Sequence, residues 1–229
     1  MPHPTSILAA TDFSDASNAA IAQATRLANA TGAPLHVLHT ASSSAADELA
    51  AFYPVTEEYA YTEFLDAVRD RIAAQLDAAG APETARVHVN TGNPFRAIVA
   101  AIEEFRTDLL VIGSTGVSGR RLGTIGGRCV RNTACNVLLV PEGFDRAFGH
   151  ITACVDFSEL SPAVLRNAAA FAASDDASLV ALYAHERVDH SVFTRGPSRE
   201  LIEALPGVIA ARFDKELRQH TGGVPVSFT

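Results

Sequence analysis

Residues 113–127 read GSTGVSGRRLGTIGG and begin at the last residue of the apolar run LLVIG (109–113). Six of the chain's 15 glycines fall within this stretch. Glycine lets a backbone turn tightly and approach a ligand, and successive exposed N–H groups form a concave site for phosphate oxygens. A surface loop without a ligand would also be rich in glycine. The position after an expected strand and before an expected helix favours the phosphate interpretation.

Short apolar runs of strand length alternate along the chain with longer segments in which apolar residues recur at three- and four-residue spacing. We expect strands at 6–11, 35–40, 85–90, 108–113 and 136–141. We expect helices at 14–31, 57–79, 94–106 and 126–133, and a polar, mobile connection at 41–58. This alternation predicts an α/β fold, namely a Rossmann-like, doubly wound parallel sheet of five strands in the order 3-2-1-4-5.

The same pattern begins a second time near residue 150. Residues 7–40 align with residues 151–184, and 12 of the 34 paired positions are identical. The tripeptide DFS occurs in both copies, at 12–14 and at 156–158. We therefore expect a tandem arrangement, in which a partial second copy lacks the glycine stretch and leaves strand edges and one sheet face uncovered. The expected domains are 1–145 and 146–229.

The composition limits the classes of partner. The 229 residues are 48% hydrophobic, which is ample for a buried core, and they carry a formal net charge of −8 with a pI near 5.4. An acidic chain is poorly suited to a nucleic-acid backbone or an anionic membrane surface, so we expect neither as a partner. Three cysteines without a CxxC pair suit a reducing compartment, and the N-terminal segment has no signal-peptide pattern. The expected localisation is cytoplasmic.

Two positions are expected to face each other across the sheet edge where ligands of this fold class bind. Asp12 ends the first expected strand, and Gly113 ends the fourth. Strands 1 and 4 are neighbours in the predicted order, so both residues border the crevice at which the winding reverses. Gly126 and Gly127 open the following helix, whose free N–H groups and dipole attract an anion. Arg120 would add positive charge.

Two common nucleotide motifs are excluded. A P-loop requires GxxxxGK followed by Ser or Thr, and residues 113–127 contain no lysine. A dinucleotide fingerprint requires GxGxxG after the first strand, where this chain has TDFSDAS instead. The glycine stretch therefore belongs to another kind of nucleotide or phosphate site.

Three features together resemble the universal stress protein family: ILAATDFSDAS at 7–17, the segment TGNPFRAIVAAIEEFRTDLLVIGSTG at 91–116, and the spacing Gly113-x2-Gly116-x9-Gly126. The resemblance covers residues 5–141 completely and residues 150–229 in part. It implies the five-stranded Rossmann-like sheet that the strand pattern also predicts.

The resemblance also implies an adenine-nucleotide ligand, namely ATP with or without Mg. Asp12 and Thr40 would contact its adenine and ribose end, and the glycines would line its phosphates. The family's loop closes with a serine or threonine after its last glycine, whereas this chain has Gly127 there. The missing hydroxyl predicts weaker phosphate binding.

The complete set of candidate nucleotide-binding residues is Ala10, Thr11, Asp12, Thr40, Gly113, Ser114, Thr115, Gly116, Arg120, Gly126, Gly127, Asn136 and Val137. We predict no catalytic residue, because no strong general base stands beside the expected γ-phosphate. We predict no metal ligand either, because the segment AHERVDH (184–190) matches no common zinc spacing.

The expected function is ATP binding as a state signal in stress response, in a homodimer, with at most slow ATP hydrolysis or autophosphorylation. Two alternatives stay open. One is an interaction scaffold that binds no nucleotide. The other is a phosphotransferase, for which Asp12 is the obvious metal-holding carboxylate.

Overall fold

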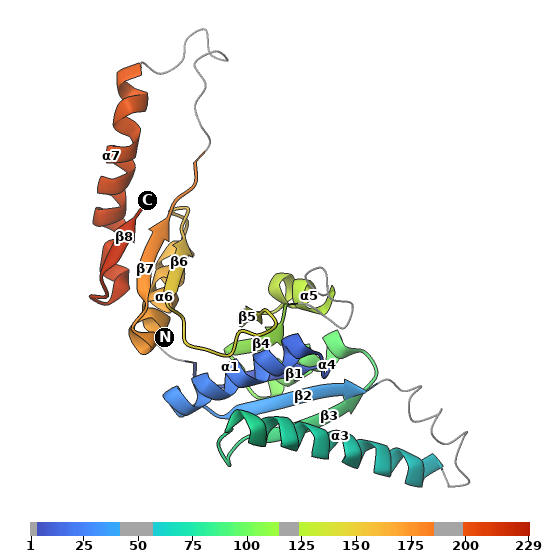
Figure 1. Cartoon of the computed structure of the whole chain (residues 1–229). Coiled ribbons are helices and arrows are strands. Elements are labelled where there is room, and N and C mark those ends of the chain that lie inside the picture. Colours follow the sequence, from blue (N-terminus) through green and yellow to red (C-terminus); the bar gives the residue numbers. More distant parts are fainter. Residues whose placement is uncertain (1–3, 42–56, 115–123, 186–198) are drawn as a thin grey trace. The chain divides into compact units, whose positions relative to one another are not determined.

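The computed structural model describes four ranges of the chain (Figure 1), namely residues 4–41, 57–114, 124–185 and 199–229. Within them the chain divides into two compact units, Pro4–Arg146 and Ala147–Thr229. Each unit holds one parallel sheet with its own hydrophobic core. Most of the polar connection expected at 41–58 lies outside the described residues.

The first unit alternates strands and helices, as the sequence predicts, and runs from blue to yellow-green in Figure 1. Its elements are β1 (Ile7–Thr11), α1 (Asp15–Thr31), β2 (Leu35–Ala41), α3 (Glu57–Ala79), β3 (Arg86–Thr91), α4 (Pro94–Glu104), β4 (Leu109–Gly113), α5 (Thr124–Asn132) and β5 (Asn136–Val140). All strand pairs are parallel, and the sheet order is β3-β2-β1-β4-β5. The predicted fold class and strand order are confirmed.

Side-chain caps and a left-handed glycine set the ends of the helices. Ser14 accepts a hydrogen bond from the N–H of Ser17 at the start of α1. Asn93 accepts one from the N–H of Arg96 at the start of α4. Gly32 follows α1 at φ 71°, a conformation that glycine adopts without strain. The sequence predicts all three boundaries, since capping residues and glycine stand at these positions.

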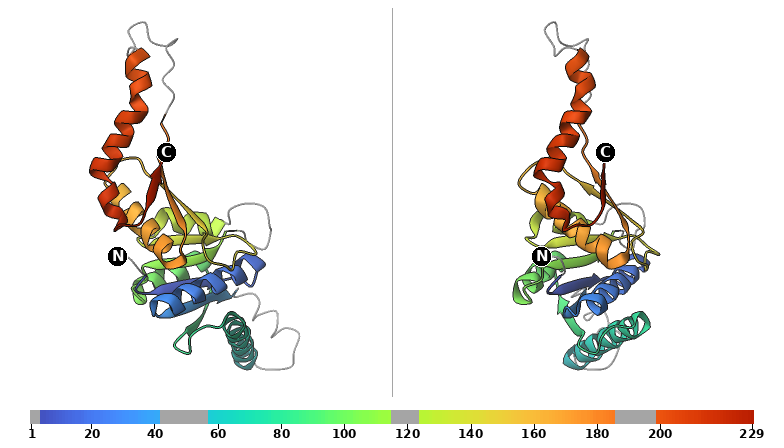
Figure 2. Two further views of the ribbon diagram at one scale, coloured as in Figure 1. Left: turned by 60° about the vertical axis from the view of Figure 1, so that its left-hand side comes forward. Right: turned by 90° about the vertical axis from the view of Figure 1, so that its left-hand side faces the viewer.

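The central strand β1 is buried on both faces, because every residue from Ile7 to Thr11 is buried. The α1 helix packs with α3, and α4 packs with α5 (Figures 1 and 2). Right-handed crossovers place these two pairs on opposite faces of the sheet. Leu8, Leu38 and Leu110 form one core cluster with Ile98 of α4. A parallel sheet covered on both faces explains why the strands are almost continuously apolar.

The second unit contains a smaller parallel sheet and runs from yellow to red in Figure 1. Its elements are β6 (His150–Cys154), α6 (Ser161–Asp175), β7 (Ser178–Leu182), α7 (Arg199–Glu216), a 3-10 helix (Arg218–Thr221) and β8 (Val226–Phe228). The strand order is β6-β7-β8, which is the arrangement that β1, β2 and β3 have in the first unit. Among the described strands, none pairs with the second edge of β6.

The helices of the second unit cover one face of its sheet. Leu165 of α6 and Phe213 of α7 share one core cluster with Ala153 of β6. Thr152 and Cys154, on either side of Ala153, are exposed, because successive residues of a strand face opposite sides. The second sheet is therefore one-sided, whereas the first is buried on both faces.

The exposed face of β6 is polar where the first sheet is apolar. Thr152 and Cys154 align with Leu8 and Ala10 of β1, which are both buried. The uncovered face was expected to make association necessary. Its exposed side chains on β6 are small or polar, whereas Val180 and the exposed Leu182 of β7, which pair with Thr152 and Cys154, keep the same face partly apolar. The homodimer expected from this face stays a prediction.

Two histidines of adjacent strands lie close together in the first sheet. Nδ1 of His36 lies 3.0 Å from Nε2 of His88, and both rings stack on Phe105 with centroid separations of 4.2 and 4.3 Å. Burial lowers the pKa of both imidazoles below the ordinary value, and the charge of Arg86 adds to this effect. Repulsion from His88 also lowers the pKa of His36, while Glu104 opposes both shifts.

We predict that acid destabilises the first unit through this histidine pair. A histidine with a lowered folded-state pKa contributes stability that is present above its unfolded pKa and is lost as the pH falls below it. The unfolding temperature of the wild-type chain should fall more steeply below about pH 6.5 than that of the double variant His36→Val/His88→Thr. Equal pH slopes in the two proteins would contradict the prediction.

Candidate functional site

The carboxyl ends of β1 and β4 lie side by side, because Ala10 pairs with Ile112 in parallel register. Asp12 follows β1 directly, and Ser114 follows β4 directly. Thr40 lies near the end of β2, which pairs with the other side of β1. The structure thus gathers several of the sequence-predicted site residues at one edge of the sheet.

The carboxylate of Asp12 is anchored through one of its two oxygens. Oδ1 accepts hydrogen bonds from the N–H of Ser14 at 3.1 Å and from the hydroxyl of Ser14 at 2.5 Å. Oδ2 has no partner in the described part of the chain, and Asp12 is exposed. The site therefore presents a carboxylate oxygen of fixed direction that can accept hydrogen bonds from a ligand.

Thr11 stabilises this turn through its hydroxyl, and Ala10 belongs to the core next to it. The hydroxyl oxygen of Thr11 accepts a hydrogen bond from the N–H of Phe13 at 3.1 Å and lies 3.1 Å from the hydroxyl of Ser17. Thr11 is 6% exposed and Ala10 is 8% exposed. Their side chains are therefore part of the turn and the core, so a ligand could reach little of either residue.

Gly113 is required by a close approach between secondary-structure elements. A Cβ atom at this position would lie 2.9 Å from the carbonyl carbon of Ala16 and 3.0 Å from the amide nitrogen of Ser17. Both atoms belong to the first turn of α1, whose backbone cannot move aside cheaply. The sequence interpretation gave Gly113 a role at the phosphates, and the structure supplies a packing reason for the same glycine.

The backbone N–H of Ser114 is already used within the sheet, since it donates a hydrogen bond to the carbonyl of Val140 at 2.8 Å. It cannot also donate to a phosphate without losing this bond. The contribution of Ser114 to a phosphate site is thus confined to its half-buried side chain.

The α5 helix begins beside the end of β4. A Cβ atom at Gly126 would lie 3.3 Å from Cδ2 of Leu139 and 3.8 Å from the carbonyl oxygen of Gly113. Gly126 and Gly127 are both buried in the first turn of α5. The unsatisfied N–H groups of a helix start favour an anion there. Three predicted phosphate contacts lie outside the described residues: Thr115, Gly116 and Arg120.

Asn136 and Val137 do not belong to this site. They pair with Leu109 and Leu110 at the amino end of β4, which is the edge of the sheet opposite Asp12. The side-chain amide of Asn136 donates a hydrogen bond to the carbonyl of Asp108. The two residues begin β5, and only the carboxyl end of a strand reaches the edge where Asp12 lies. Their inclusion in the candidate site was therefore wrong.

Three residues next to Asp12 escaped the sequence analysis. Phe13 has a left-handed backbone with φ 63°, and its ring contacts His39 and Arg71. Phe13, His39 and Arg71 are all absent from the set of candidate residues that the sequence gives. The one available signal was the repetition of the DFS tripeptide in the second copy.

Few other groups in the described ranges offer reactive chemistry. Burial raises the pKa of Cys129 to about 11, so the thiol stays protonated and poorly nucleophilic. Among the described residues, no three histidine, cysteine or acidic side chains gather as a metal site would require. Of the AHERVDH segment only Ala184 and His185 are described, so the rest cannot be placed. No helix in these ranges is long and apolar enough to span a bilayer.

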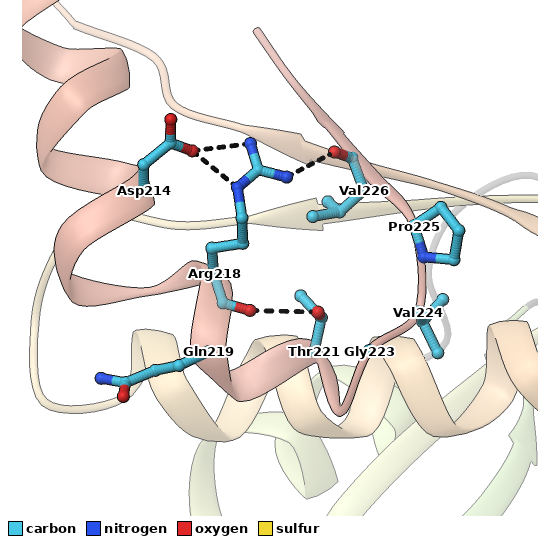
Figure 3. A pocket seen from close by; sticks show the side chains of 8 residues that line it. All are labelled: Asp214, Arg218, Gln219, Thr221, Gly223, Val224, Pro225 and Val226. Atoms are coloured by element: carbon cyan, nitrogen blue, oxygen red, sulfur yellow. Dashed lines mark hydrogen bonds and ion pairs between the residues drawn. The ribbon is translucent and has the colours of Figure 1, made fainter.

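A shallow pocket lies in the second unit between α7 and β8 (Figure 3). Its one cationic group, the guanidinium of Arg218, donates to Oδ1 of Asp214 and to the carbonyl of Val226. The hydroxyl of Thr221 donates to the carbonyl of Arg218. Asp214, Arg218 and Thr221 therefore have their hydrogen-bonding groups engaged within the pocket, which makes it a poorer ligand site than the edge of the first sheet.

A doubly wound sheet with a carboxylate at the reversal of its winding defines the class of α/β proteins whose ligands bind beyond the strand ends. A family model described as the universal stress protein family matches residues 4–141. The match spans more than half of the chain, so the chain belongs to the universal stress protein family. No curated protein matches it significantly.

Solved structures share this fold. A universal stress protein from Archaeoglobus fulgidus DSM 4304 is 18% identical with a TM-score of 0.62, over 98% of this chain and 77% of its own. A universal stress protein in complex with cAMP is 24% identical with a TM-score of 0.46, over 62% of this chain and 99% of its own. A family protein from Arabidopsis thaliana with AMP bound is 20% identical with a TM-score of 0.42, over 63% and 95% respectively.

We predict that Gly113→Ala lowers the free energy of unfolding by about 1–3 kcal/mol, because the added methyl group meets the backbone of α1. Chemical denaturation would measure the loss. Gly149→Ala is the matched control, since an added Cβ at Gly149 meets no atom within 4 Å. Equal stability of Gly113→Ala and the wild type would show that α1 does not require glycine at this position.

Proposed function

We propose that this universal stress protein binds an adenine nucleotide, ATP in particular, at the carboxyl edge of its first sheet, and acts as a binding and signalling module in stress response. Family membership and the nucleotides held by relatives, cAMP in one and AMP in another, support an adenine nucleotide as the ligand class. The observation that carries the proposal is the open Oδ2 of Asp12, which lies at the same edge of the sheet as the start of α5.

The Asp12 side of this edge suits the base and ribose of a nucleotide, and the α5 side suits its phosphates. The carboxylate of Asp12 can accept hydrogen bonds from ribose hydroxyls or from an exocyclic amine, and Thr40 lies at the neighbouring strand end. The start of α5 favours the negative charge of phosphates. The described residues at this edge include no general base beside the start of α5, and binding rather than rapid hydrolysis is the proposed activity.

The second unit is proposed to bind no nucleotide. Asp156 occupies the position of Asp12 and likewise accepts two hydrogen bonds at Oδ1, from the N–H of Ser158 at 2.9 Å and from the hydroxyl of Ser161 at 3.0 Å, so the carboxylate alone does not distinguish the two units. Hydrogen bonds from Ser158 lower the pKa of Asp156. The described part of this unit has no fourth strand and no following helix start to receive phosphates.

We predict that Asp12→Asn weakens ATP binding about tenfold, because a hydrogen bond to a charged acceptor contributes about 1.5–3 kcal/mol and the amide retains part of it. Asparagine keeps an oxygen for Ser14, so the turn is preserved. Isothermal calorimetry would measure the dissociation constants of both proteins. Unchanged affinity would remove Asp12 from the site.

The stoichiometry gives a separate prediction. Calorimetry should return one ATP per chain, and Asp156→Asn in the second unit should leave both the affinity and the stoichiometry unchanged. Two equivalents per chain would contradict a ligand-free second unit.

A scaffold that binds no nucleotide is the competing function. Mass spectrometry of the purified chain after denaturation separates the two, since a nucleotide-binding protein is expected to release co-purified adenine nucleotide. No bound nucleotide, together with no heat of binding for ATP, ADP or AMP, would favour the scaffold.

A further inference from the structure

The residue after Asp12 is held in an unusual backbone conformation. Phe13 has φ 63°, which a bulky side chain adopts only when its surroundings impose it. The guanidinium carbon of Arg71 lies 4.0 Å from the centroid of its ring, and the centroid of the His39 ring lies 4.5 Å away. Nδ1 of His39 lies 2.8 Å from the carbonyl oxygen of Thr11, so Nδ1 carries the proton and donates it.

The second unit repeats this arrangement with different residues. Phe157, in the second DFS tripeptide, has φ 60°. The guanidinium carbon of Arg212 lies 4.5 Å from its ring centroid, and the ring of Tyr183, which aligns with His39, lies 5.0 Å away. The same stack of an arginine and a second ring on the phenylalanine occurs in both units, although their sequences have diverged. We infer that the stack is linked to the left-handed turn and is not a chance result of packing.

The two stacks differ in the charge around the arginine. Arg212 forms an ion pair with Glu216 at 2.9 Å, one helical turn further along α7. One turn after Arg71 on α3 the residue is Gln75, whose side-chain amide donates to Asn18. Within the described residues Arg71 has no carboxylate partner, so its charge is not neutralised locally and can act fully on the ring of Phe13.

We propose that Arg71 is a positioning residue of the nucleotide site: its guanidinium, stacked on Phe13, holds the left-handed turn that directs the carboxylate of Asp12. This inference rests on the proposed function. The turn brings the N–H and hydroxyl of Ser14 onto Oδ1 of Asp12 and leaves Oδ2 open. If Phe13 returned to an ordinary negative φ, the contacts with Ser14 would break and the carboxylate would lose its direction.

The test compares Arg71→Met, which keeps the length of the side chain without its charge, with Arg71→Lys, which restores a cation. Arg212→Met is the matched control, because it removes the same contact from the second unit. The first measurement is hydrogen exchange at the amide of Ser14 in the ligand-free protein. We expect faster exchange in Arg71→Met than in the wild type, recovery in Arg71→Lys, and no change at Ser14 in Arg212→Met.

The second measurement is the affinity of the same proteins for AMP by calorimetry. Arg71→Met should bind AMP about two- to fivefold more weakly, as expected for loss of an exposed cation–π contact, and Arg71→Lys should recover most of the affinity. A variant that only lost stability would bind with wild-type affinity while folded. This comparison therefore separates positioning from a purely structural role.

The outcomes distinguish the inference from the function on which it rests. Wild-type AMP affinity or unchanged Ser14 exchange in Arg71→Met would overturn the positioning role, and so would failure of Arg71→Lys to recover both. Absence of AMP, ADP and ATP binding to the wild-type chain would instead overturn the proposed function. The exchange rates would then still decide whether Arg71 holds the turn.

Discussion

The hydrogen bonds between Ser14 and the carboxylate of Asp12 join the end of β1 to the start of α1, and the rest of the candidate site depends on them. They let the chain leave a buried strand and enter a helix within three residues. The first turn of α1 thereby comes close enough to β4 to require glycine at position 113. The end of β4 in turn lies against the start of α5. The short turn between β1 and α1 therefore affects both parts of the candidate site, Asp12 and the start of α5.

The fold of the first unit is largely predictable from its sequence because its central strands, β1 and β4, are buried on both faces. Such strands are continuously apolar, and the caps at Ser14 and Asn93 mark the helix starts. The α5 helix begins at Thr124 and not at Gly126, an ordinary uncertainty of helix ends. Asp12 was predicted at the correct edge, since the end of a strand and the order of the sheet determine where a residue lies.

The remaining features of the site depend on contacts that no local pattern encodes. Asn136 and Val137 stand at the start of β5. The edge of the sheet at which they lie is determined by where β5 begins and by its register with β4, and residue type does not reveal either. The need for glycine at 113 arises from a helix distant in sequence. The left-handed φ of Phe13 contradicts the ordinary preference of phenylalanine, so sequence alone would not suggest it.

The edge of β6 with which no described strand pairs has a consequence for behaviour in concentrated solution. Natural edge strands commonly carry lysine, proline or a bulge, which prevent another strand from adding to them. The β6 sequence HITAC contains neither residue and no acidic side chain. Wherever this edge is accessible, its unpaired backbone N–H and C=O groups are a template for strand addition between molecules, so the second unit is open to aggregation through its backbone.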